Sequence, residues 1–134
     1  MTMKHFTIKE LTVSTTAERL GIDNTPTTEA VGNLRQLVAN VLDPLREAYG
    51  HPIYVNSGYR CPALNRAVGG VPSSQHLTGE AADITAGSKR ENRRLLALVK
   101  KMKLPVDQVI DEQDCTWLHI SYGPRHRRSF LAIN

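Results

Sequence analysis

Apolar residues recur at helical spacing between about Thr28 and Tyr49. They fall three or four positions apart and would share one face, which predicts an amphipathic helix over residues 28–49. Pro44 lies inside this stretch and is expected to kink or split the helix, because it has no backbone N–H to donate. Gly50 is a natural end for the helix. The apolar stripe consists of Val31, Leu34, Val38, Val41, Leu42 and Leu45.

A second helix is predicted to begin after Ser88. Ser88 and Glu91 stand three positions apart, which is the arrangement of a capping box. Pro105 ends the helix, because proline cannot continue it. Its apolar stripe consists of Leu95, Leu98, Val99 and Met102.

Shorter apolar runs predict strands. Residues 53–55 form a β-prone run, and residues 81–85 have the character of a buried strand. Residues 108–110 and 117–122 predict two strands joined as a hairpin. Because helices come first and short strands intermix later, the order of elements predicts an α+β fold with a small antiparallel sheet packed against helices.

The remaining segments are less regular. Residues 6–27 are expected to form an irregular arm, and residues 62–68 a short helix closed by two glycines. The chain has no internal repeat or long linker. Its 134 residues therefore suit a single domain of residues 1–134.

Composition excludes several classes of protein. A hydrophobic fraction of 40% and a charged fraction of 22% are typical of a globular chain rather than a disordered one. The net charge of +4 suits an anionic partner such as a cell-wall polymer or a nucleic acid, but it is also common among soluble proteins. No segment approaches the roughly 18 apolar residues that span a bilayer, so we expect no membrane partner.

The N-terminus and the cysteines bear on the compartment. The first ten residues lack the apolar run of a signal peptide. We therefore expect synthesis in the cytoplasm and action on a cell wall only after release, as for a prophage protein. Two cysteines, Cys61 and Cys115, are too few for a disulfide framework. Free thiols are favoured over a single bridge, because nothing indicates secretion.

Two histidines and one aspartate carry the most informative chemistry. His76 and Asp83 stand seven positions apart across Gly79, and His119 lies in a strand-like run. Two histidines and a carboxylate are a ligand set that hydrolytic zinc uses while leaving a fourth position open for water. Each residue alone suits an ordinary structural role, but the three together favour a metal centre with one Zn²⁺.

A metal-activated water needs a carboxylate to accept its proton. The candidates are Asp111, Glu112 and Asp114, all shortly before His119. Glu112 is the preferred base, because it would end a strand whose hairpin partner carries His119. Asp114 is better interpreted as a solvated residue of the hairpin tip.

Arg60 follows the predicted strand of residues 53–55 and a glycine turn. Its planar guanidinium suits a carboxylate or a polarised carbonyl. The alternative is an ordinary surface arginine.

These motifs resemble the zinc D-Ala-D-Ala carboxypeptidase family, which includes D,D-carboxypeptidases, D-Ala-D-Ala dipeptidases and phage endolysin peptidases. The resemblance extends from about Phe6 to the C-terminus. It is carried by Ser57-Gly58-Tyr59-Arg60, Leu64-Asn65, residues 74–83 (Ser-Gln-His-Leu-Thr-Gly-Glu-Ala-Ala-Asp) and Trp117-Leu118-His119-Ile120-Ser121.

The resemblance implies that His76, Asp83 and His119 bind one zinc. It implies that Arg60 binds substrate or stabilises an oxyanion. The substrate would be a peptidoglycan stem peptide, cut by a chain that we expect to be a monomer. The other motif residues assigned to substrate binding are Tyr59, Ser74, Gln75 and Trp117.

The chain departs from many of these relatives at Thr116. Their catalytic carboxylate stands three residues before the last histidine ligand, where this chain has a threonine that cannot act as a base. In the most similar subgroup an acid ends the preceding strand, which here is Glu112. A non-catalytic cell-wall-binding or phage structural module is therefore the alternative function.

The basic tail and Cys115 also have residue types that bind ligands. The basic tail, residues 125–128, would meet wall polymer or phosphate, but a solvated surface is favoured. Nucleic-acid binding is disfavoured, because no aromatic platform accompanies the tail. Cys115 stands four residues before His119, a spacing found in structural zinc sites, yet suitable histidine partners are not nearby.

Overall fold

One five-stranded sheet organises the computed structural model, which describes residues 3–133. The strand order is β1-β2-β4-β3-β5. Neighbouring strands are antiparallel, except that β3 and β5 run parallel. The strands are β1 (Tyr54–Ser57), β2 (Ala81–Thr85), β3 (Gln108–Glu112), β4 (Trp117–Ser121) and β5 (Ser129–Ile133).

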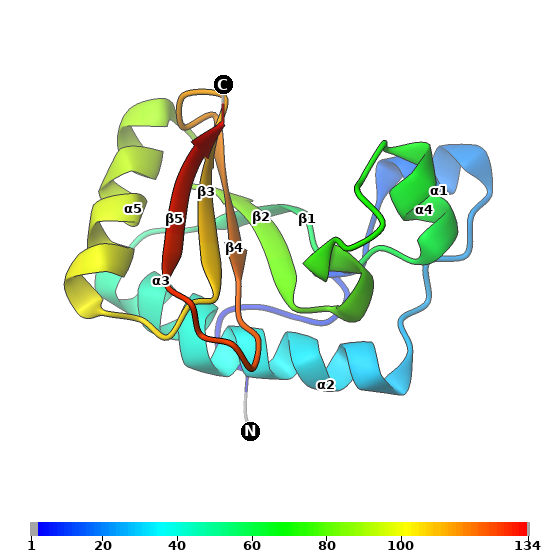
Figure 1. Cartoon of the computed structure of the whole chain (residues 1–134), viewed down its shortest axis with the longest axis horizontal. Helices are drawn as coiled ribbons and strands as arrows, with labels where there is room; N and C mark the ends of the chain where they lie inside the picture. Colours follow the sequence, from blue (N-terminus) through cyan, green and yellow to red (C-terminus); the bar gives the residue numbers. More distant parts are fainter. Residues whose placement is uncertain (1–2, 134) are drawn as a thin grey trace.

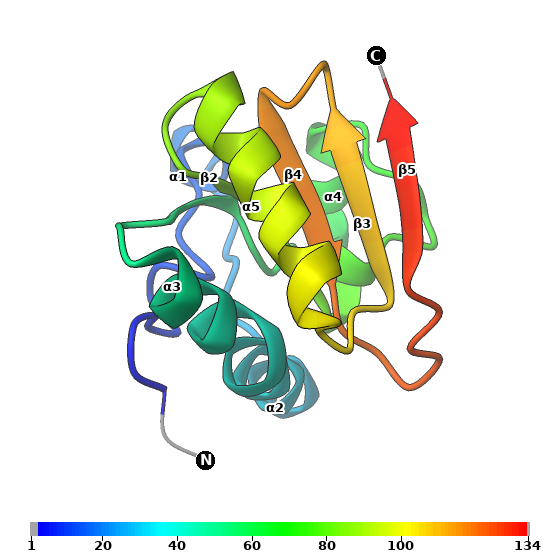
Figure 2. The same ribbon diagram turned by 90° about the vertical axis from the view of Figure 1, so that its left-hand side faces the viewer.

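Helices lie on both sides of this sheet (Figures 1 and 2). Helix α5 covers one face, with α2 and α3 beside it, whereas α1 and α4 lie beyond the opposite face. The helical elements are α1 (Thr15–Leu20), α2 (Thr28–Leu37), the π-helix η1 (Val38–Leu42), α3 (Asp43–Tyr49), α4 (Pro62–Ala67), the 3₁₀-helix η2 (Gln75–Thr78) and α5 (Lys89–Met102).

The helix predicted over residues 28–49 is one continuous run of α2, η1 and α3. It does not split at Pro44, since the π-helix η1 leads directly into α3. Pro44 has no N–H for the carbonyl of Asn40, and its ring would crowd that carbonyl in an ordinary α-helix. In the π-helical turn just before Pro44, the N–H of Asp43 donates to the carbonyl of Val38, five residues back, so the regular α-helical pattern is already shifted where the proline enters.

The hydrophobic core lies between the sheet and the helices. On β4, Leu118 and Ile120 are fully buried and pack with Leu95 and Val99 of α5. Burying each of these side chains contributes about 1.5–3 kcal/mol. Because side chains alternate along a strand, His119 faces the other side of the sheet.

The predicted α+β class is confirmed, with three local corrections. The arm over residues 6–27 contains helix α1, which Ser14 caps by accepting a hydrogen bond from the N–H of Ala17. Strand β5 was not predicted, and its pairing makes the sheet mixed rather than purely antiparallel. The capping box is half formed: Ser88 accepts from the N–H of Glu91, whose carboxylate instead accepts from the hydroxyl of Tyr49.

The structure also bears on the expectations for the two cysteines and for membrane-spanning helices. Cys61 and Cys115 are free thiols, as predicted. Within residues 3–133, no helix is both long and apolar enough to cross a membrane. The expected domain of residues 1–134 reaches slightly beyond the described residues at each end.

Candidate metal centre

The register of the sheet places two predicted ligands opposite each other. Asp83 on β2 pairs with His119 on β4, and on its other side it pairs with Ser57 of β1. Directly opposed residues have Cβ atoms about 4.5–5.5 Å apart, so their side chains meet without any further adjustment. The pairing of β2 with β4 therefore brings two of the three candidate ligands together.

His76 comes from the 3₁₀-helix η2, which a short loop presents to the sheet. Ser74 caps η2 by accepting a hydrogen bond from the N–H of His76, and Gly79 ends it in a left-handed conformation with φ of 78°. The Nδ1 atom of His76 donates to the carbonyl of Gly58 over 2.7 Å. This contact leaves Nε2 as the atom that faces Asp83, which is how a backbone carbonyl orients a histidine ligand.

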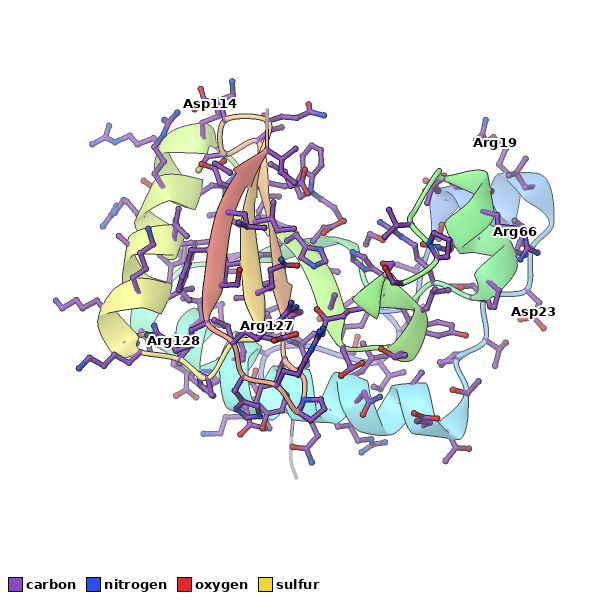
Figure 3. The ribbon with its side chains drawn as sticks, viewed as in Figure 1. Arg19, Asp23, Arg66, Asp114, Arg127 and Arg128 are labelled. Carbon is purple, nitrogen blue, oxygen red and sulfur yellow. The ribbon has the colours of Figure 1, made fainter. Side chains whose placement is uncertain are left out.

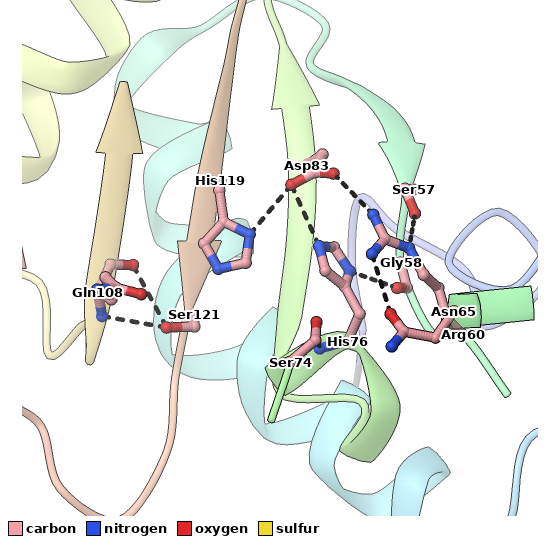
Figure 4. A network of polar contacts seen from close by, with 10 residues as sticks. All are labelled: Ser57, Gly58, Arg60, Asn65, Ser74, His76, Asp83, Gln108, His119 and Ser121. Carbon is pink, nitrogen blue, oxygen red and sulfur yellow. Dashed lines mark hydrogen bonds and ion pairs between the residues drawn. The ribbon is translucent and has the colours of Figure 1, made fainter. Parts of the chain in front are cut away.

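The donor atoms are close enough to share one ion (Figure 4). Asp83 Oδ1 lies 3.3 Å from His76 Nε2 and 3.1 Å from His119 Nδ1. With zinc–ligand bonds of about 2.0–2.1 Å and tetrahedral angles, two donor atoms lie about 3.3 Å apart. The three side chains are largely buried, with 3%, 13% and 12% exposure for His76, Asp83 and His119. The donor set thus fits zinc in both chemistry and spacing.

The electrostatics favour an ionised carboxylate. Burial raises the pKa of Asp83, but hydrogen bonds from His119 and His76 outweigh it, so the pKa lies well below its usual range. Arg60 adds a positively charged partner, with Nη2 3.5 Å from Asp83 Oδ2. Ser57 and Asn65 hold this arginine by accepting from its Nε and Nη1.

The centre opens onto a cleft of about 930 Å³, which Arg60 and Glu112 also line. Glu112 ends β3, opposite Trp117. Burial, followed by the negative charge of Asp83, raises the pKa of Glu112 above its ordinary value. The arrangement can therefore hold a metal ion and offer it a weakly acidic carboxylate from a neighbouring strand.

A model of the peptidase M15 family matches residues 4–121. The chain belongs to the peptidase M15 family. It is also similar to the zinc D-Ala-D-Ala carboxypeptidase of Streptomyces albus G, with 47% identity over 49 residues. That stretch covers 36% of this chain and only 19% of the carboxypeptidase.

In this M15 family member, the other two acids near β4 face elsewhere. Asp111 accepts a hydrogen bond from the backbone N–H of Cys115 and so stabilises the hairpin turn. Asp114 is exposed and pairs with Arg93 at the hairpin tip. Glu112 is therefore the acid of this group that lines the cleft.

Of the residues predicted to bind substrate, all but Tyr59 line the cleft. Ser74, Gln75 and Trp117 line the cleft together with Arg60. Tyr59, by contrast, is 4% exposed and packs in the hydrophobic core. Its side chain therefore belongs to the packing beneath the site, and we leave it out of the substrate-binding residues.

The basic tail, residues 125–128, was predicted to be a solvated surface, but two of its arginines line the cleft. Arg125 and Arg127 line the cleft and pair with Asp107, a fully buried aspartate just before β3. Sequence reasoning did not single out Asp107, because no local spacing links it to a tail some twenty residues later. Only the fold shows that Asp107 is buried opposite these arginines.

A structural zinc site at Cys115 finds no support. Cys115 is 1% exposed, and burial raises the pKa of its thiol to about 11. Among the described residues, His76, Asp83 and His119 are the one group that brings three potential ligands together.

Proposed function

We propose that this M15 family member is a zinc peptidase that hydrolyses peptide bonds in peptidoglycan stem peptides. The observation that carries the proposal is the placement of His76, Asp83 and His119 around one point in a cleft that Glu112 and Arg60 also line. The name of the Streptomyces relative supports both the metal and the D-Ala-D-Ala type of substrate.

In the proposed reaction His76, Asp83 and His119 hold one zinc. When bound, zinc lowers the pKa of a water molecule to about 7 and polarises a carbonyl. Glu112 accepts the proton of the attacking water on its carboxylate and delivers it to the leaving amine. Burial and the charge of Asp83 raise the pKa of Glu112 above its ordinary value, which favours acceptance of a proton.

Arg60 and the cleft residues orient the peptide. The guanidinium of Arg60 is 15% exposed and held by Ser57, Asn65 and Asp83, so it can donate to a substrate oxygen from a fixed position. Ser74, Gln75 and Trp117 provide further contacts along the cleft. All these residues come from one chain, so we propose that a monomer is sufficient.

The position of the cleaved bond in the stem peptide distinguishes two versions of this proposal. A D,D-carboxypeptidase removes a terminal residue, whereas an endolysin-like endopeptidase cuts within the stem peptide. Both use the same centre, and the product formed from a muropeptide distinguishes them.

The test uses protein loaded with one zinc per chain and purified muropeptides, with products followed by mass spectrometry. The wild type should release amino acids or shorter peptides, and Glu112→Gln should lower kcat by about 10²–10⁴-fold with zinc content unchanged. Glu29→Gln, a matched change at an exposed residue of α2, should leave turnover unaltered. If the wild type releases no product from any muropeptide with zinc verified, the chain is a binding or structural module instead.

A further inference from the structure

A buried acid organises two arginines at one end of the cleft. Asp107 is fully buried, and Arg127 donates to it three times: from Nε over 2.8 Å, from Nη2 over 3.1 Å and from its backbone N–H over 3.2 Å. Gln75 donates to the same carboxylate over 2.8 Å. Arg125 lies 3.6 Å away and completes the group. We call these four residues the Asp107 cluster.

The Asp107 cluster is connected to two of the elements that carry the candidate metal ligands. Gln75 immediately precedes His76, so its bond to Asp107 ties η2 to the start of β3. The N–H of Asp107 donates to the carbonyl of Ser121. Ser121 lies two residues beyond His119 on β4, which is about 7 Å at the rise of a strand. The start of β3, to which the cluster is attached, is therefore held beside the strand that carries His119.

The cluster and Glu112 stand at opposite ends of the cleft. Glu112 ends β3 at the hairpin, whereas Asp107 immediately precedes β3. Figure 3 shows Arg127 at one end of the sheet and Asp114, in the hairpin, at the other. Ile110 lines the cleft between the two ends. A peptide bound along this face would therefore meet positive charge at one end and the proposed base at the other.

The cluster carries one positive charge in excess. Two guanidinium groups face one carboxylate, and hydrogen bonds from Arg127 hold the pKa of Asp107 down to about 2, so it stays ionised. The side chains of Arg127 and Arg125 are 41% and 61% exposed, and both line the cleft. Among the contacts of the described residues, none engages Nη1 of Arg127. That nitrogen is available to an anionic ligand while Nε and Nη2 fix the plane of the fork.

We propose that Arg127 and Arg125 bind a free carboxylate of the peptide substrate, with Asp107 as the residue that positions them. The proposal rests on the peptidase function proposed above and names the chemical group that the cleft selects. A carboxylate of the peptide fits better than a polymer phosphate, because the two arginines line the same cleft as the candidate metal ligands. The planar fork of an arginine also matches a carboxylate.

The test pairs a charge removed from the enzyme with a charge removed from the substrate. Zinc-loaded wild type, Arg127→Gln and Arg125→Gln are each assayed on a stem pentapeptide and on versions in which each free carboxylate in turn is an amide. For one of these carboxylates, amidation should raise KM of the wild type about 10- to 100-fold. Each arginine variant should raise KM for the parent peptide while leaving KM for that amide nearly unchanged.

Two further variants separate positioning from loss of structure. Asp107→Asn should raise KM for the free carboxylate with little change in kcat or zinc content, a split that general unfolding would not produce. Arg90→Gln removes the same charge from an exposed residue of α5, on the opposite face of the sheet, and should behave as wild type.

The outcomes distinguish the two proposals. If the wild type cleaves the peptides but no amidation changes the effect of either arginine variant, the carboxylate site is wrong and the peptidase function stands. If the wild type cleaves none of them, the peptidase function is wrong. Calorimetric binding of the same peptides then decides the carboxylate site: equal affinity of the parent peptide for wild type and Arg127→Gln would overturn it.

Discussion

Replacing Asp107 with asparagine should destabilise the fold measurably, although the two side chains have nearly the same shape. The variant loses the charge that Arg127 and Gln75 hold and brings an N–H₂ group toward their donors. Hydrogen bonds from Arg127, with a smaller contribution from Gln75, outweigh burial and lower the pKa of Asp107 from 3.8 to about 2. Each pKa unit corresponds to about 1.4 kcal/mol, so the interaction is worth at most about 2.4 kcal/mol. Because Arg127 is 41% exposed and screened by solvent, we expect about 1–2 kcal/mol.

The effect should depend on pH in a defined direction. A carboxylate whose pKa is depressed in the folded state stabilises the fold above the unfolded pKa of about 3.8 and loses this contribution as the pH falls toward 2. Urea unfolding of wild type and Asp107→Asn should therefore differ most above pH 4 and converge near pH 2. Asp114→Asn, at an exposed ion pair, is the matched control and should cost less than about 1 kcal/mol. Equal stability of wild type and Asp107→Asn at pH 7 would refute the reasoning.

Three other substitutions test separate parts of the structure. Gly79→Ala should lower the stability measured by thermal unfolding by about 1–3 kcal/mol. The added Cβ would lie 2.4 Å from the carbonyl oxygen of Ala30, and the backbone φ of +78° disfavours alanine. An unchanged Tm would contradict this close approach. Cys115→Ser should leave zinc content at one per chain, and a loss of zinc would instead place the metal at Cys115. Asp83→Ala should reduce zinc bound after dialysis to well below one per chain, while full retention would show that the ion lies elsewhere.

The sequence predicted the elements that have a strong periodic signal. The two long helices and the β3–β4 hairpin follow from apolar spacing, because each buries one face against a single core. The π-helix before Pro44 could not be predicted, since it depends on how the chain accommodates a proline without losing the packing of both helical halves. Strand β5 was missed because its parallel pairing with β3 is a long-range contact that no local pattern encodes.

The candidate ligands could be identified from residue types, but their geometry could not. Asp83 lies beside His119 because β2 pairs with β4, which is a matter of strand register between distant segments. His76 depends on the carbonyl of Gly58, where a side chain would collide with the backbone of Leu11. Tyr59 shows the opposite case: its place in a motif suggested substrate contact, but the core buries it.

The arginines of the Asp107 cluster explain why a basic tail is easily misread. Most exposed basic runs are solvated, and residues 125–128 have no helical or strand periodicity that would suggest a site. Their role in the fold appears only when Asp107 is found fully buried beneath them. Long-range pairing of a buried charge was therefore the information that the sequence lacked.

The most direct test of the central claim is a crystal structure of the zinc-loaded protein with diffraction data collected at the zinc absorption edge. We predict one anomalous peak about 2.0–2.2 Å from His76 Nε2, an oxygen of Asp83 and His119 Nδ1. Glu112 should face the remaining open position of the ion. A peak at any other group of residues, or no peak at this site after loading with zinc, would contradict the account.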